Sequence, residues 1–180
     1  MSDKKNKIVF DLETQKEFKE VGGKQNLAEL KISVVGAYDY ATDTLRGYLE
    51  NEIEEFEKLL KDSVVIGYNI RQFDFPVLKP YLKNTDIDSV EMIDIMEELQ
   101  NILGYRISLD SVAEATLGIK KSGHGLQAVE YYRRGEIDKI VSYCLDDVKI
   151  TRDIYEFAKK NGYLKFKAGW DIYEVPIKMK

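Results

Sequence analysis

The 180-residue chain has one cysteine, one histidine, one tryptophan and three prolines. With a single cysteine, Cys144, no internal disulfide can form, which fits a reducing compartment, and we expect a cytoplasmic protein. Cys144 lies within an apolar helical pattern, and we expect it to pack as a small buried hydrophobic side chain.

Long hydrophobic runs are also lacking. No window is long and apolar enough to cross a bilayer, and residues 1–7 are polar, so we expect neither a membrane partner nor a signal peptide. The formal net charge of −5 argues against a protein that holds nucleic acid on a broad basic surface. It leaves open an enzyme that meets phosphates through bound metal ions, because carboxylate ligands raise the acid count.

What is present is a globular composition, with 44% hydrophobic and 33% charged residues, and we expect one domain over residues 1–180. Its pattern predicts a strand at 8–14, a polar loop at 15–26 and a hairpin of strands at 30–40 and 44–49. A helix, a buried strand at 63–68, a helix to residue 82 and a short strand at 88–93 follow. We expect helices at 94–103, 109–117, 126–133 and 136–160, with Asp94 and Asp110 as caps, then a terminal strand or docked arm.

Asp11 and Glu13 lie two residues apart at the end of the first strand. Side chains at i and i+2 of a strand point to the same face, so both carboxylates project together. Two adjacent carboxylates repel each other, and a hard divalent cation bound by oxygen ligands relieves that cost. The sequence therefore predicts a metal site here if other acids fold back to this point.

Two later segments supply such acids. Asp74 begins a helix after the buried strand at 63–68, and ligands gather at the carboxyl ends of strands in α/β sheets. Tyr143 and Asp147 are four residues apart on the last long helix and share one face. Asp146 shares a face with Tyr143 as well, and we favour Asp147 as the ligand only because of the resemblance that follows.

An Asp-x-Glu, an Asn-x-x-x-Phe-Asp and a Tyr-x-x-x-Asp, in this order over residues 8–151, resemble the three motifs of the DEDDy exonucleases. That resemblance, to the family that includes proofreading domains of DNA polymerases, implies a ribonuclease H-like fold: a mixed sheet of five or six strands, an antiparallel meander and then parallel crossovers, with helices on both faces. It implies a 3′→5′ exonuclease that releases nucleoside 5′-monophosphates from the 3′ ends of single-stranded DNA or RNA.

The resemblance also implies roles for single residues. Four acids would hold two Mg²⁺ or Mn²⁺ ions: Asp11, Glu13, Asp74 and Asp147. Tyr143 would orient the attacking water, and Asn69 and Phe73 would contact the terminal nucleotide, whose base and sugar would meet Leu12. We assign Thr14 to substrate binding as well.

Other features stay open between two interpretations. The segment 120–125 is glycine-rich and basic, and Lys121 and His124 are candidates for binding a substrate phosphate, although a plain connector explains the segment equally well. Arg133, Arg134 and the aromatic, lysine-rich tail would extend a nucleic-acid track or, as we favour, form a solvated helix face and a packed terminal strand. For the whole chain, the alternatives to a free-standing enzyme are a non-catalytic 3′-end binding module and a nuclease subunit of a larger repair or RNA-processing assembly.

Overall fold

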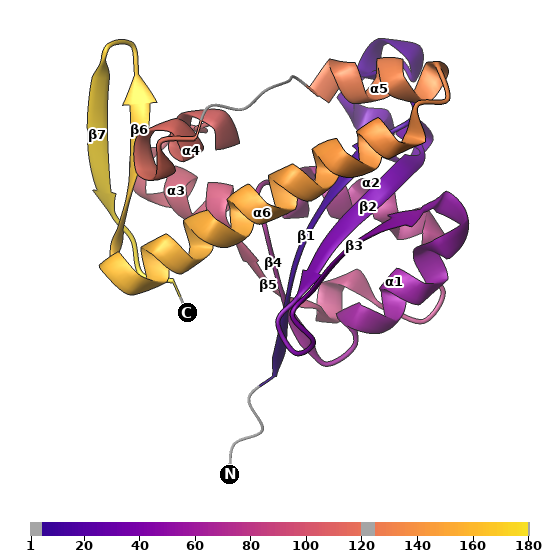
Figure 1. Cartoon of the computed structure of the whole chain (residues 1–180), viewed down its shortest axis with the longest axis horizontal. Coiled ribbons are helices and arrows are strands. Elements are labelled where there is room, and N and C mark those ends of the chain that lie inside the picture. Colours follow the sequence, from indigo (N-terminus) through magenta and orange to yellow (C-terminus); the bar gives the residue numbers. More distant parts are fainter. Residues whose placement is uncertain (1–4, 120–124, 180) are drawn as a thin grey trace.

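A five-stranded sheet forms the centre of the protein in the computed structural model, which describes residues 5–119 and 125–179 (Figure 1). Its strands lie in the order β3-β2-β1-β4-β5. Their bounds are β1 Asn6–Thr14, β2 Ile32–Asp39, β3 Thr44–Leu49, β4 Ser63–Gly67 and β5 Glu91–Asp94.

The directions of the strands follow from their connections. β2 pairs antiparallel with β1 on one side and with β3 on the other, and a short turn joins β2 to β3. β1, β4 and β5 are parallel, which requires crossovers, and helix α1 (Ile53–Leu60) lies in the one that leads to β4. The expected order of an antiparallel meander and then parallel crossovers is confirmed.

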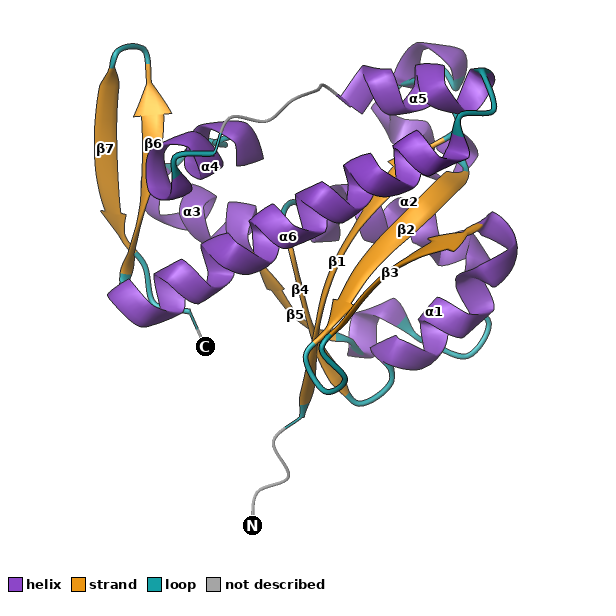
Figure 2. Ribbon diagram, in the orientation of Figure 1, coloured by secondary structure: helices purple, strands orange, loops and turns teal. Residues whose placement is uncertain are grey.

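Helices cover both faces of the sheet (Figure 2). On one face, Ile8, Phe10 and Leu12 of β1 pack into a core with α1 and with α2 (Phe75–Leu78). Val9 points to the other face, where it shares a core with the long helix α6 (Ile137–Asn161). This alternation is the two-residue period of a strand, and it puts Asp11 and Glu13 on the α6 side.

Close approach of α6 to the sheet depends on Gly36 of β2. A Cβ atom built on Gly36 would lie 2.9 Å from Cys144 Sγ and 3.1 Å from Val148 Cγ2, so a larger residue would push the helix outward. Cys144 is fully buried here, as expected of a small hydrophobic side chain.

The second half of the chain is mainly helical. Helices α3 (Ile95–Leu103), α4 (Leu109–Leu117) and α5 (Gly125–Arg133) precede α6. The tail forms a separate two-stranded sheet of β6 (Tyr163–Ala168) and β7 (Asp171–Pro176), so the central sheet keeps five strands. The edge of β6 is held by α4, where the Ser111 and Thr116 hydroxyls bond to the backbone of Lys167 and Lys165.

Several local expectations need correction. The loop expected at 15–26 contains the 3₁₀ helix η1 (Phe18–Glu20) and the beginning of η2 (Lys24–Leu30). The helix expected up to residue 82 is broken into η4 (Ile70–Asp74), α2 and η5 (Lys79–Tyr81), and Pro80, which lacks an N–H donor, lies at the last break. Short 3₁₀ turns also occur at η3 (Glu50–Glu52) and η6 (Ile87–Ser89).

The two expected caps differ in outcome. Asp94 does cap α3, because its side chain accepts hydrogen bonds from the amides of Met96 and Glu97. Asp110 is not a cap: Ser108 takes that position on α4 and accepts from the amide of Ser111.

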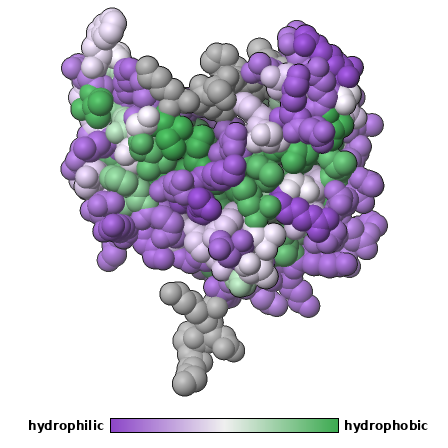
Figure 3. Space-filling model, in the orientation of Figure 1, coloured by the Kyte–Doolittle hydropathy of each residue, from purple (hydrophilic) through white to green (hydrophobic). Residues whose placement is uncertain are grey.

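The described helices include none with the length and apolar character to cross a membrane. The face drawn in Figure 3 is largely hydrophilic, with hydrophobic side chains gathered in separate patches.

Candidate active site

Three carboxylates converge between β1 and α6. Asp11 and Glu13 project from β1 towards α6, and Asp147 meets them from that helix. One carboxylate oxygen from each of the three lies within 4.8 Å of the others. Glu13 and Asp147 are buried, at 9% and 5% exposure, so little water screens their mutual repulsion.

The structure distinguishes Asp147 from its neighbour. Asp146 is exposed and forms an ion pair with Lys149, at 2.9 Å, on the outer face of α6. Asp147 points inward, one turn after Tyr143, and lies in the carboxylate cluster. The geometry thus places Asp147, rather than Asp146, with Asp11 and Glu13.

Cys144 lies against the same cluster. Its Sγ atom is 3.4 Å from the backbone oxygen of Asp11 and 3.8 Å from Asp11 Oδ2. Burial, together with the charges of Asp11 and Glu13, raises the pKa of the Cys144 thiol well above its usual range. The thiol stays protonated, and the cysteine packs as a neutral residue beside the acids.

Asp74 reaches the site from η4, after the end of β4. It is almost fully buried, and its Oδ1 atom accepts a hydrogen bond of 3.1 Å from the Leu12 amide. Burial raises the pKa of Asp74, and the Leu12 amide opposes that rise while Asp94 and Asp147 add to it. Asp74 is not one of the three clustered carboxylates, but it lines the same pocket.

A pocket of about 400 Å³ opens beside the acids. It brings together nine of the eleven residues that the sequence assigned to catalysis or substrate binding: Asp11, Leu12, Glu13, Thr14, Asn69, Phe73, Asp74, Tyr143 and Asp147. The other two, Lys121 and His124, lie outside the described residues. Both polar and apolar residues line the pocket, and Leu12 and Phe73 add apolar groups beside the carboxylates.

The loop that carries Asn69 is held in an uncommon conformation. Asn69 has a left-handed backbone with φ of 69°. Its amide donates to Asp94 Oδ1 over 2.8 Å, and the Arg71 amide donates to Asp94 Oδ2 over 3.0 Å. Arg106 donates a hydrogen bond to the side-chain oxygen of Asn69. Asp94 therefore caps α3 and fixes this loop at the same time.

Sequence reasoning missed several parts of this site. It missed Arg106, which bonds to Asn69, and it missed that Asp94 holds the Asn69 loop as well as capping α3. Both contacts join residues that are distant in the chain. Six more residues that the sequence did not single out line the pocket: Lys16, Glu17, Phe18, Leu30, Tyr68 and Val129. Tyr68 could have been found because it directly precedes Asn69, whereas nothing in the sequence pattern singles out Phe18 or Val129.

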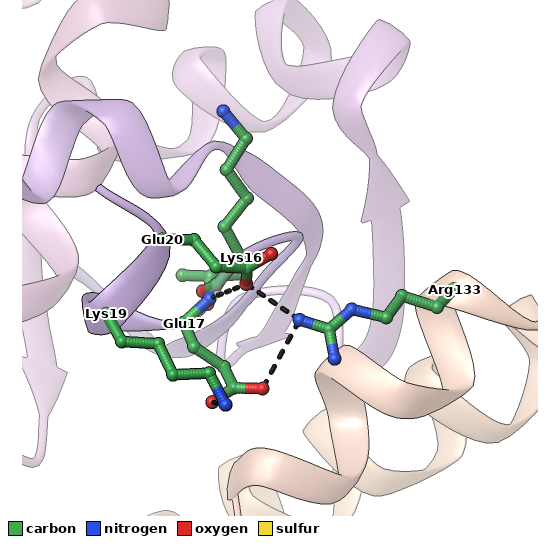
Figure 4. Close-up of polar contacts among 6 residues, drawn as sticks. Lys16, Glu17, Lys19, Glu20 and Arg133 are labelled. Carbon is green, nitrogen blue, oxygen red and sulfur yellow. Dashed lines mark hydrogen bonds and ion pairs between the residues drawn. The ribbon is translucent and has the colours of Figure 1, made fainter. Parts of the chain in front are cut away.

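The two arginines considered for a nucleic-acid track form ion pairs. Arg133 of α5 pairs with Glu17 at 3.2 Å and with Glu20 at 2.7 Å, and Arg134 pairs with Glu130 at 3.6 Å (Figure 4 draws the Arg133 contacts). Their charges are balanced by neighbouring carboxylates, which supports the interpretation as a helix face.

Comparison with known families agrees with this geometry. The family model described as RNase_H superfamily matches residues 8–159, which span β1, the Asn69 loop and most of α6. The chain belongs to the RNase H superfamily. No curated protein matches it. Membership and the buried acidic cluster together indicate a nuclease, and hence a nucleic-acid substrate.

RNase H-like nucleases use divalent metal ions, and the residues here fit such ions. The donors are hard carboxylate oxygens, which suit Mg²⁺ and Mn²⁺. Their closeness and burial would be costly without a cation to balance the charge.

Proposed function

We propose that this RNase H-like protein is a metal-dependent 3′→5′ exonuclease that removes nucleoside 5′-monophosphates from the ends of single-stranded DNA or RNA. The observation that carries the proposal is the arrangement of Tyr143 and four carboxylates around one pocket. Three separate segments of the chain supply these groups, each at the sequence position that the resemblance to DEDDy exonucleases implies.

Asp11, Glu13 and Asp147 would bind the metal directly, and Asp74 would complete a site for two Mg²⁺ or Mn²⁺ ions. When bound, such ions lower the pKa of a water molecule and stabilise the charge on a leaving oxygen. In the proposed reaction, water attacks the phosphorus of the last phosphodiester, and the bond from phosphorus to the 3′ oxygen of the preceding nucleotide breaks. A proton is transferred to that 3′ oxygen, which leaves a new 3′-hydroxyl end.

Tyr143 would hold the attacking water. Tyr143 lines the pocket one helical turn from Asp147, so its hydroxyl and that carboxylate would face the same part of a bound substrate. A tyrosine hydroxyl both donates and accepts hydrogen bonds, which allows it to fix the direction of a water lone pair towards phosphorus.

The remaining pocket residues would position the terminal nucleotide. Phe73 and Leu12 provide apolar surface for the base and sugar, and Thr14 lies beside them at the end of β1. Because Arg106 engages the side-chain oxygen of Asn69, the Asn69 amide nitrogen is oriented as a donor for an acceptor atom of the nucleotide. Lys121 and His124 would contribute to phosphate binding from the segment 120–125.

A gel time course with 5′-labelled single-stranded DNA and RNA of the same sequence tests the proposal. With Mg²⁺ or Mn²⁺, we expect a ladder that shortens from the 3′ end, and no change in EDTA. Asp11→Ala should abolish the ladder while the protein stays folded. Full-length substrate that persists with every metal while binding is retained would contradict the proposal and indicate a non-catalytic 3′-end binding module.

A further inference from the structure

Residues 16–20 border the pocket shortly after the end of β1. Lys16, Glu17 and Phe18 all line the pocket. The start of the segment is tied to the residues before β2, because the Lys16 amide donates to Leu30 O over 3.2 Å. The Thr14 hydroxyl donates to Lys16 O over 2.9 Å. The segment is therefore fixed to the sheet at its base.

Its first lateral contact is aromatic. Phe18 packs edge-on against Phe73 of η4, with ring centroids 5.9 Å apart and an interplanar angle of 67°. Phe73 also lines the pocket. This pair joins the segment to η4 beside the pocket.

Its second lateral contact is ionic and reaches α5. In Figure 4, Arg133 extends from α5 towards Glu17 and Glu20 of the segment, and Lys19 forms an ion pair with Glu17. The Lys19–Glu17 pair is 2.8 Å long, and the Glu17 side chain is only 14% exposed. Val129 lies one helical turn before Arg133 on α5 and also lines the pocket. The segment is therefore joined to α5 as well.

The charges around this segment are largely paired. Hydrogen bonding to Lys19, with further help from Arg133, holds the pKa of Glu17 below its usual range, so the carboxylate stays ionised. Glu17 and Glu20 balance the charges of Lys19 and Arg133, which leaves Lys16 as the cation of the segment that lines the pocket.

We propose that residues 16–20 form an end stop, which closes the pocket at one end so that it accepts the free 3′ end of a single strand and excludes an unbroken strand. The end stop rests on the proposed exonuclease function and adds the reason for its specificity: the terminal nucleotide lies against residues 16–20, whose contacts with η4 and α5 obstruct a further nucleotide within the described part of the chain.

Circular and linear forms of one single-stranded sequence, as DNA and as RNA, test the end stop. The wild type should degrade the linear strand and leave the circle intact. The double variant Phe18→Ala/Arg133→Ala removes both lateral contacts, and we expect its ratio of circle nicking to linear degradation to rise at least about tenfold over the wild type. The matched control is Arg134→Ala, whose arginine pairs within α5 and does not reach the end stop.

The possible failures are distinguishable. If the wild type degrades no linear strand with any metal, the exonuclease function itself is wrong. If the wild type nicks circles, or if a folded double variant degrades linear strands without nicking circles, the end stop is wrong.

A second measurement needs no variant. With streptavidin bound to a biotin on the 3′-terminal nucleotide, the wild type should leave the strand intact, and release of a blocked 3′ fragment of two or more nucleotides would overturn the proposal.

Discussion

The Leu12 amide donates a hydrogen bond of 3.1 Å to Asp74 Oδ1, across 62 residues of sequence. Leu12 lies between Asp11 and Glu13 on β1, where it joins the core around Phe10 and also borders the pocket. The strand that carries Asp11 and Glu13 therefore also holds Asp74 in place, through its backbone. Side-chain changes at position 12 leave this bond possible, so the position of Asp74 depends on the β1 backbone.

The adjacent acids on α6 allow a matched comparison. Asp147→Asn should lower nuclease activity by about 100-fold or more, because a carboxylate of the metal cluster is lost. Asp146→Asn removes only an exposed ion pair with Lys149 and should retain activity within about twofold. Initial rates with Mg²⁺ on a 5′-labelled strand measure both. Equal losses in the two variants would contradict the assignment of Asp147.

Tyr143→Phe separates the water-orienting hydroxyl from the packing of the ring. We expect kcat to fall about 100-fold, the lower range for a positioned proton-transfer or water-orienting group, with KM nearly unchanged. Mn²⁺ binding, followed by calorimetry, should remain as in the wild type because the carboxylates are intact. A wild-type kcat in this variant would remove Tyr143 from the mechanism.

Glu57 should give a stability difference that depends on pH. It is 3% exposed and accepts hydrogen bonds from the amides of Lys83, at 3.0 Å, and Asn84, at 2.6 Å. Burial alone would raise the pKa of Glu57, but these amides hold it below its usual value of 4.5. The carboxylate therefore contributes stability above about pH 4.5, and this contribution is lost as the pH falls through the folded-state pKa.

Glu57→Gln should lower the free energy of unfolding by about 2 kcal/mol at pH 7, because an amide group faces backbone N–H donors. Urea titrations from pH 3 to pH 8 should show this difference shrink below pH 4.5. The control is Glu54→Gln, whose exposed pair with Lys83 Nζ contributes less than about 1 kcal/mol. A difference between Glu57→Gln and the wild type that is constant down to pH 3 would contradict the role of the charge.

The sequence predicts the central part of this structure well, for a physical reason. Strand β1 alternates between two cores, so local periodicity is sufficient to put Asp11 and Glu13 on the α6 face. On α6 periodicity leaves Asp146 and Asp147 equivalent, and the resemblance is what singles out Asp147, the acid that the structure puts in the cluster.

What the sequence does not predict depends on contacts between distant segments. Phe18 meets Phe73, and Arg133 meets Glu17, only after the sheet and α5 are in place, and no local pattern encodes either pair. Ser108 caps α4 in place of Asp110 because two polar residues compete two positions apart, and propensity does not decide between them.

Gly36 links the packing of α6 to the geometry of the site. Gly36→Ala puts a Cβ atom 2.9 Å from Cys144 Sγ, and relief requires α6 to move away from β2. Overpacking of this kind costs about 1–3 kcal/mol, and the same displacement moves Asp147 away from Asp11, so activity should fall together with stability. Adding Cys144→Ala removes the opposing sulfur and should recover much of both losses. If thermal unfolding and nuclease rates show no recovery in the double variant, the contact between Gly36 and Cys144 does not set the distance between α6 and the sheet.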